Sequence, residues 1–146
     1  MPAALAIDVP ALASRFRIAV VRLARTLRRE AGTGVTPSLY SALATIEHHG
    51  PITVSALAEH EGVRKPTTTR TARALVDLGL VTRIPDPVDG RVSWLDLTSE
   101  GRRLLQRARR RTDEYLARRL KRLSPEDAAT LQRAADIIER LLEEGR

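Results

Sequence analysis

The stretch that decides the fold is residues 80–98, which read LVTRIPDPVDGRVSWLDLT. Two runs rich in apolar and β-branched residues, 80–84 and 91–97, flank the segment 85–90, which contains two prolines and a glycine. Extended runs on either side of such a turn-forming segment are typical of a β-hairpin. The sequence therefore predicts a hairpin whose tip is formed by residues 85–90.

Two short helices joined by a tight turn are predicted just before the hairpin. Thr53 can cap a helix that continues to about His60, and Gly62 supplies the turn into a second helix from Lys65 to about Leu78. At about 100° per residue, one side of this second helix is apolar or small and is predicted to pack inward. That inward side comprises Thr68, Ala72, Leu75 and Leu78. Helix, turn, helix and hairpin in this order predict a winged helix-turn-helix.

Four further helices, of which the second is short, are predicted on both sides of this unit, from apolar residues at steps of three and four and from capping residues at their starts. They cover residues 10–30, 36–49, 98–123 and 124–144. The fold class is therefore mainly α with a small β-hairpin wing (α+β), a winged helix-turn-helix with N- and C-terminal dimerisation helices. We expect a single chain 1–146 in which 36–98 form the DNA-binding lobe. Residues 8–34 and 99–146 form dimerisation helices, because their apolar stripes exceed what one small lobe can bury.

The amino-acid composition indicates which kind of molecule the protein binds. The chain of 146 residues has a formal net charge of +7, and all but two of its 25 basic residues are arginines. Arginine suits bidentate contact with phosphate and guanine, so an acidic polymer is the expected partner. No apolar run approaches the roughly 18 to 20 residues of a membrane span, and the N-terminal residues lack a basic leader, so we expect a cytoplasmic protein with no membrane partner.

The sequence predicts no disulfide, metal site, enzyme activity or cofactor. Cysteine is absent, which removes disulfides and thiolate metal sites. His48, His49 and His60 lack the spacing and the further ligands of a tetrahedral site, so no metal site is predicted. None of the usual nucleophile, carboxylate-pair or phosphate-loop spacings occurs, so the protein is not expected to be an enzyme. No cofactor is predicted, and no residue is assigned to bind one.

A basic, hydroxylated face is predicted on the helix that follows Gly62, opposite its inward side. It carries Lys65, Pro66, Thr69, Arg70 and Arg73. Such a face suits the major groove of duplex DNA, where arginine or lysine pairs with guanine and threonine meets a base edge. Arg91, at the tip of the predicted hairpin, can enter an adjacent minor groove.

The chain resembles the MarR-type (multiple antibiotic resistance) regulators over essentially its whole length. The resemblance is carried by 83–91 with Asp89 and Arg91, by 95–98 and Gly101, and by the segments 57–58, 62–63, 65–67, 69–70 and 79–81. It implies that Thr67, Thr69 and Arg70 occupy recognition-helix positions, that Arg91 is the wing arginine, and that Asp89 holds the wing by an ion pair. The chain departs from the family at Arg64, where a small capping residue is usual, and a phosphate contact is expected there.

The resemblance also implies a homodimeric repressor of a palindromic operator, released by a small aromatic or phenolic anionic ligand. Such a ligand would bind between the dimer helices and the DNA-binding lobe, where Tyr40, Phe16 and arginines of the first helix can line a pocket. Two alternatives stay open. One is a nonspecific architectural DNA-binding protein, and the other is a dimeric protein-interaction module on the same fold. Whether the strongly basic helix 98–123 contacts DNA also stays open.

Overall fold

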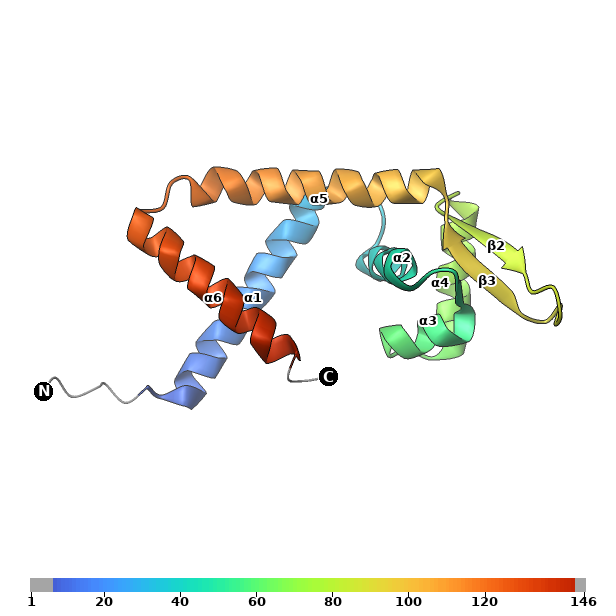
Figure 1. Ribbon diagram of the computed structural model, residues 1–146, viewed down its shortest axis with the longest axis horizontal. Coiled ribbons are helices and arrows are strands. Elements are labelled where there is room, and N and C mark those ends of the chain that lie inside the picture. The colour runs from blue at the N-terminus through green and yellow to red at the C-terminus, as the bar shows by residue number, and fades with distance from the viewer. Residues whose placement is uncertain (1–6, 144–146) are drawn as a thin grey trace, which may run out of the picture.

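The computed structural model describes residues 7–143, which form six helices and three short strands (Figure 1). In chain order these are α1 (Val9–Ala31), α2 (Pro37–His49), β1 (Ile52–Thr53), α3 (Val54–Glu61), α4 (Lys65–Asp77), β2 (Val81–Pro85), β3 (Ser93–Leu97), α5 (Ser99–Leu120) and α6 (Pro125–Glu143). The predicted winged helix-turn-helix is confirmed, because α3, α4 and the β2–β3 hairpin follow one another as expected. The predicted end of the last helix, at Glu144, lies outside the described residues.

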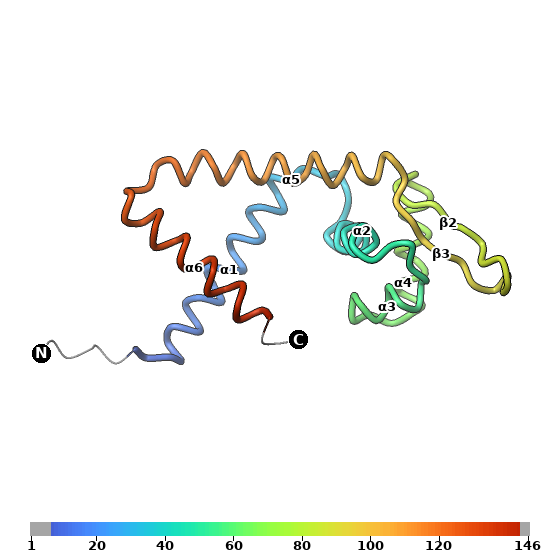
Figure 2. The backbone as a smooth tube through the Cα atoms, viewed as in Figure 1, coloured from blue at the N-terminus to red at the C-terminus, as the bar shows by residue number. Residues whose placement is uncertain are grey.

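The long helix α5 forms a straight spine. In Figures 1 and 2 the lobe made of α2, α3, α4 and the sheet lies at one end of α5, while α1 and α6 extend from its other part. Thr98 fixes the start of the spine, since its hydroxyl accepts from Gly101 N at 3.1 Å and donates to Gly79 O at 2.6 Å. The turn after α4 is thereby tied to the first turn of α5.

The core of the lobe is aliphatic. Each of α2, α3, α4, β3 and α5 contributes at least one fully buried side chain, chiefly Leu43, Ile46, Leu57, Leu75, Leu95 and Leu105. Burying one such side chain is worth about 1.5–3 kcal/mol relative to leaving it exposed. Thr68 and Ala72 are buried as predicted, but the prediction for Leu78 is wrong: α4 ends at Asp77, and Leu78 is 54% exposed.

The sheet has one strand more than predicted. Its order is β1–β3–β2, with Ile52 opposite Leu95 and Arg83 also opposite Leu95 on the other side of β3. β1 is only two residues long, and its last residue, Thr53, also caps α3 by accepting from Ala56 N at 3.2 Å. The cap was predicted, but two residues are too few to show the alternation by which a strand is recognised.

The helices α1 and α6 are barely buried in the protomer. Ala31 is the only buried residue of α1, and α6 has none within the part of the chain that the structure describes. Their apolar side chains therefore face outward, with Phe16 at 43% and Leu141 at 59% exposure. None of the helices in residues 7–143 is both long and apolar enough to span a membrane.

Candidate nucleic-acid interface

A tight turn after α3 sets the direction of α4. Gly62 adopts a left-handed φ of +64°, and the N–H groups of Gly62 and Val63 donate to the last carbonyls of α3. A left-handed glycine with such bonds is the usual end of a helix, because other residues pay a steric penalty there. With Leu57 and Leu75 fully buried against the core, α4 is held with one face outward.

The outward face of α4 carries the predicted side chains. Lys65, Pro66, Thr67, Thr69, Arg70 and Arg73 are all exposed, whereas Thr68, Ala72 and Leu75 on the opposite face are buried. Within residues 7–143 no carboxylate pairs with the cations of this face. The Thr69 hydroxyl donates to Lys65 O at 2.9 Å, so its oxygen lone pairs and its methyl group are the parts left for a ligand.

The start of α4 lacks a side-chain cap. Arg64 occupies the N-cap position with extended backbone, and no side chain accepts from the first N–H groups of the helix. The predicted loss of a capping acceptor is therefore confirmed. Arg64 and Lys65 add two positive charges to the positive end of the helix dipole, a combination that attracts phosphate.

Asp86 organises the tip of the wing. Its Oδ1 accepts from Val88 N and Asp89 N at 2.9 Å each, and its Oδ2 accepts from Trp94 Nε1 at 2.9 Å. These bonds favour the charged carboxylate, and the bond from Asp89 N contributes most to lowering the pKa of Asp86 below its ordinary value. The wing therefore has a fixed shape although most of its residues are exposed.

Asp89 stabilises the wing differently from the prediction. Its Oδ1 accepts from the backbone N–H of Arg91 at 3.0 Å, and no ion pair joins it to a cation in the described part of the chain. The reason is local, because an aspartate two residues before an amide closes an Asx turn with that amide. The predicted ion pair is therefore wrong, and the guanidinium of Arg91 stays free at the wing tip.

The wing and α4 meet in a polar notch that the sequence did not predict as a site. Lys65 and Thr69 of α4 line it from one side, and Arg83, Arg91 and Ser93 of the wing from the other. The start of α3, residues 53–55, closes the notch. Arg83 Nη1 donates to Ser93 Oγ at 3.4 Å, which directs its guanidinium across the hairpin. Arg83 stands in the wing signature, but only the folded structure places it in one notch with Lys65 and Arg91.

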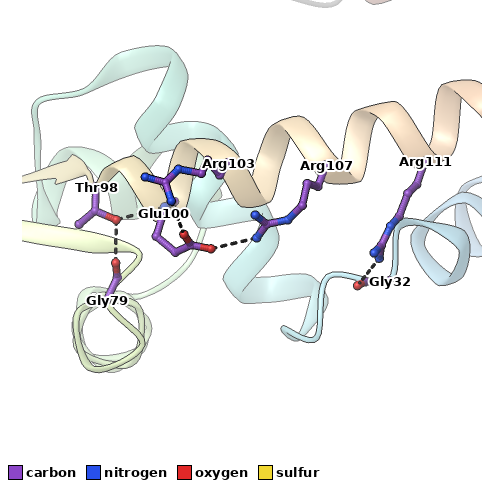
Figure 3. Close-up of polar contacts among 8 residues, drawn as sticks. Gly32, Gly79, Thr98, Glu100, Arg103, Arg107 and Arg111 are labelled. Atoms are coloured by element: carbon purple, nitrogen blue, oxygen red, sulfur yellow. Dashed lines mark hydrogen bonds and ion pairs between the residues drawn. The ribbon is translucent and has the colours of Figure 1, made fainter.

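Some arginines in the first half of α5 are paired with carboxylates. Arg103 and Arg107 contact Glu100 at 3.3 and 3.0 Å, and Arg107 lowers the pKa of Glu100 (Figure 3). Arg109 pairs with Glu47 of α2, and Glu47 raises the pKa of that guanidinium. Because Glu100 is shared by two arginines, this stretch of α5 keeps a net positive charge after the pairing.

Arg111 joins α5 to the end of α1 in a different way. Its Nη1 donates to Gly32 O at 2.9 Å and to Ala31 O at 3.3 Å, as Figure 3 shows for Gly32. A cation at the C-terminal carbonyls of a helix is favoured by the helix dipole. Arg109 and Arg111 therefore hold α2 and the end of α1 against α5.

The histidines form ring contacts. His49 stacks on His60 with 3.9 Å between ring centroids, and His48 meets His49 edge-on. Within residues 7–143 no group of three or more His, Cys, Asp or Glu side chains is placed to hold a metal ion. The contact links the ends of α2 and α3.

Sequence comparison finds a family model and relatives that are described as transcriptional regulators. The family model described as MarR family matches residues 35–93. An uncharacterised HTH-type transcriptional regulator of Mycobacterium leprae is 42% identical over 134 residues, covering 91% of this chain and 94% of the relative. The HTH-type transcriptional repressor MdtR of Bacillus subtilis is 38% identical over 68 residues, covering 47% of this chain and 44% of the relative.

Solved structures share the fold over nearly the whole chain. RV1404 from Mycobacterium tuberculosis matches with a TM-score of 0.83 at 24% identity, covering 95% of this chain and 97% of that chain. A mutant of S. aureus MepR bound to an oligodeoxyribonucleotide matches with a TM-score of 0.69 at 21% identity, covering 90% of this chain and 96% of that chain.

Proposed function

The chain belongs to the MarR family of winged helix-turn-helix transcriptional regulators, which are not enzymes, and on that premise we propose that it represses transcription as a homodimer on a specific duplex operator. One observation carries this proposal. Lys65 of α4 and Arg91 of the wing line the same notch, and within residues 7–143 neither of them is ion-paired. A recognition helix in the major groove and a wing in the adjacent minor groove require cations from both elements along the intervening backbone.

The residues of the interface divide into a group that contacts DNA bases and a group that contacts DNA phosphates. Thr67, Thr69, Arg70 and Arg73 face the major groove from α4, and Arg91 enters the minor groove from the wing. Arg64, Lys65 and Arg83 contact phosphates, since they lie at the positive end of α4 and in the notch. Asp89 acts indirectly, through the backbone of Arg91. A regulator that binds DNA in this way works in the cytoplasm.

Dimerisation supplies the second recognition helix. The unburied apolar sides of α1 and α6 support residues 8–34 and 99–146 as the dimerisation helices, with 36–98 as the DNA-binding lobe. Two lobes related by a two-fold axis place their α4 helices about one DNA turn apart, on a palindromic operator.

A pocket of about 220 Å³ supports release by a small aromatic or phenolic anion. Leu27 and Arg28 of α1, Tyr40 of α2 and Thr112 of α5 line it, so it lies between the dimerisation helices and the lobe. Tyr40 and an arginine of α1 were predicted to line such a pocket, whereas Phe16 does not line it. An aromatic anion fits an apolar wall with one guanidinium, and its binding shifts the lobe against α1.

Selection of bound duplexes from a random DNA pool, at near-physiological salt, tests this function. Enrichment of one two-fold symmetric site is the expected result. Binding without enrichment would support the architectural alternative, and no DNA binding would support the protein-interaction module.

A further inference from the structure

The hydroxyl of Thr69 is held by the backbone of its own helix. Its Oγ1 donates to Lys65 O at 2.9 Å, a bond of the kind that a helical threonine makes to the preceding turn. Staggered geometry at the β carbon then directs the methyl group, Cγ2, away from that carbonyl. Because Thr69 is exposed, a molecule that binds α4 at this point meets the methyl group and the lone pairs of Oγ1.

Thr69 lies in the first half of α4, the part of a recognition helix that contacts base edges. Lys65 and Arg73 lie four residues before and four residues after it, so each is about one turn away on the same side of the helix. Pro66, three residues before Thr69, is also exposed, and its ring carries no hydrogen-bond donor. The Thr69 methyl group and the Pro66 ring therefore give this basic face a small apolar spot.

The bond to the backbone limits which bases Thr69 can recognise. With its proton on Lys65 O, Oγ1 can only accept a hydrogen bond, and guanine presents only acceptors, O6 and N7, in the major groove. Adenine N6 and cytosine N4 are donors there, and thymine alone carries a C5 methyl group. An A·T pair therefore offers both a donor for Oγ1 and an apolar partner for Cγ2, whereas a G·C pair lacks the methyl group.

We propose that Thr69 selects an A·T pair in each half-site of the operator, through contact of its Cγ2 with the C5 methyl group of thymine. The contact suits the apolar spot, because two methyl groups that meet are both removed from water and leave no polar group unpaired. This inference rests on the proposed function and names the base pair that one residue of α4 recognises.

Deoxyuridine isolates this contact, because it has the hydrogen-bonding edge of thymidine and lacks only the methyl group. Each thymine of the selected operator is replaced in turn, at symmetric positions in both half-sites, and fluorescence anisotropy measures the Kd of the full-length protein for each duplex.

Three variants are compared with the wild type. Thr69→Ser keeps the hydroxyl and loses the methyl group, whereas Thr69→Val keeps a methyl group in its place, in the rotamer that valine prefers in a helix. Thr71→Ser is the matched control, because it removes a methyl group from the side of α4 that lines a recess with residues of α2. Circular dichroism verifies that each variant is folded.

At one thymine per half-site, uracil should lower the affinity of the wild type about tenfold, because the dimer loses two methyl contacts. Thr69→Ser should bind the unmodified operator about as weakly as the wild type binds that uracil duplex, and uracil at this position should weaken its binding no further. Thr69→Val and Thr71→Ser should stay sensitive to uracil.

A second substitution of the DNA tests the methyl group by restoring it. When a C·G pair replaces the same T·A pair, the affinity of the wild type should fall. It should be partly recovered with 5-methylcytosine, whose methyl group takes the place of the thymine methyl group. Thr69→Ser should show no such recovery.

Three results would overturn the inference. If no thymine shows a uracil effect that depends on residue 69, the Thr69 methyl group does not meet a thymine. If Thr69→Ser stays sensitive while Thr69→Val becomes insensitive, the hydroxyl carries the recognition. A selected operator without an invariant A·T pair contradicts the inference directly. If the pool yields no enriched site at all, the proposed function itself fails, whereas an operator insensitive to uracil removes only the role of the Thr69 methyl group.

Discussion

The indole nitrogen of Trp94 donates a 2.9 Å hydrogen bond to Asp86 Oδ2, which ties strand β3 to the tip of the wing. The other oxygen of the same carboxylate accepts from two backbone N–H groups of the tip. Trp94 is the only tryptophan of the chain, so tryptophan emission reports on the surroundings of this one indole, which include the Asp86 contact. The wing can therefore be followed separately from the rest of the molecule.

Asp86→Ala should loosen the wing without unfolding the protein. The substitution removes three accepted hydrogen bonds outside the core, so Tm should change little, whereas DNA affinity should fall several-fold because the wing must be ordered on binding. Fluorescence anisotropy with a labelled duplex measures the affinity. Asp113→Ala, which removes an exposed carboxylate of α5, is the matched control and should bind as the wild type does.

Low pH should release the Trp94 contact only below the ordinary range of aspartate. The pKa of Asp86 is lowered in the folded wing, so the stabilisation is complete above the unfolded pKa of about 4 and is lost as the pH falls through the lower, folded pKa. Trp94 emission should be constant from about pH 7 to pH 5 and change below about pH 4. A transition above pH 5 that Asp86→Ala abolishes would contradict this assignment.

Arg91→Ala should weaken binding to all duplexes and reduce the salt dependence of binding. The free guanidinium at the wing tip is assigned to the minor groove, so its loss should lower the slope of log K against log salt by about one. Arg83→Ala should act similarly from the notch. Arg110→Ala, in the exposed part of α5, is the control. An unchanged slope in the Arg91 variant would remove the wing from the interface.

Gly101→Ala should destabilise the lobe. A Cβ at this position would overlap the carbonyl oxygen of Leu80, which itself accepts from Thr98 N. Backbone must move to admit the methyl group, and overpacking of this kind costs about 1–3 kcal/mol in the free energy of unfolding. Gly90→Ala is the matched control, because a Cβ there meets no atom within 4 Å. Urea denaturation compares the two variants.

Local signals in the sequence were sufficient for the elements and for the exposed face of α4. Thr36, Thr53 and Thr98 each begin a helix with a capping bond, as their positions predicted. Leu78 was misplaced because periodicity continues through a residue at which the helix has already ended. Local patterns also describe which residues share a helix face, but not which faces find a partner.

Contacts between distant segments were not predictable. Arg109 and Glu47 are 62 positions apart, so nothing in the basic run of α5 indicated that it is partly neutralised. The notch depends on the register that joins β2 to β3. Likewise, Asp89 accepts from the backbone N–H of Arg91 and forms no ion pair with a guanidinium in the described chain, although both groups are close to it in sequence. Such contacts depend on distances in the folded protein, which cannot be read from a single sequence.

The most direct test of the central claim is the ratio of affinities for the selected operator and for a shuffled duplex of the same composition. Both affinities should be measured at about 0.15 M salt, for the wild type and for Thr69→Ala and Arg70→Ala. A specific regulator should prefer the operator by about 10³-fold or more. Arg70→Ala should lower that ratio by roughly tenfold, and Thr69→Ala should lower it with little change in binding to the shuffled duplex. A wild-type ratio near one, unaffected by either substitution, would contradict sequence-specific reading by α4.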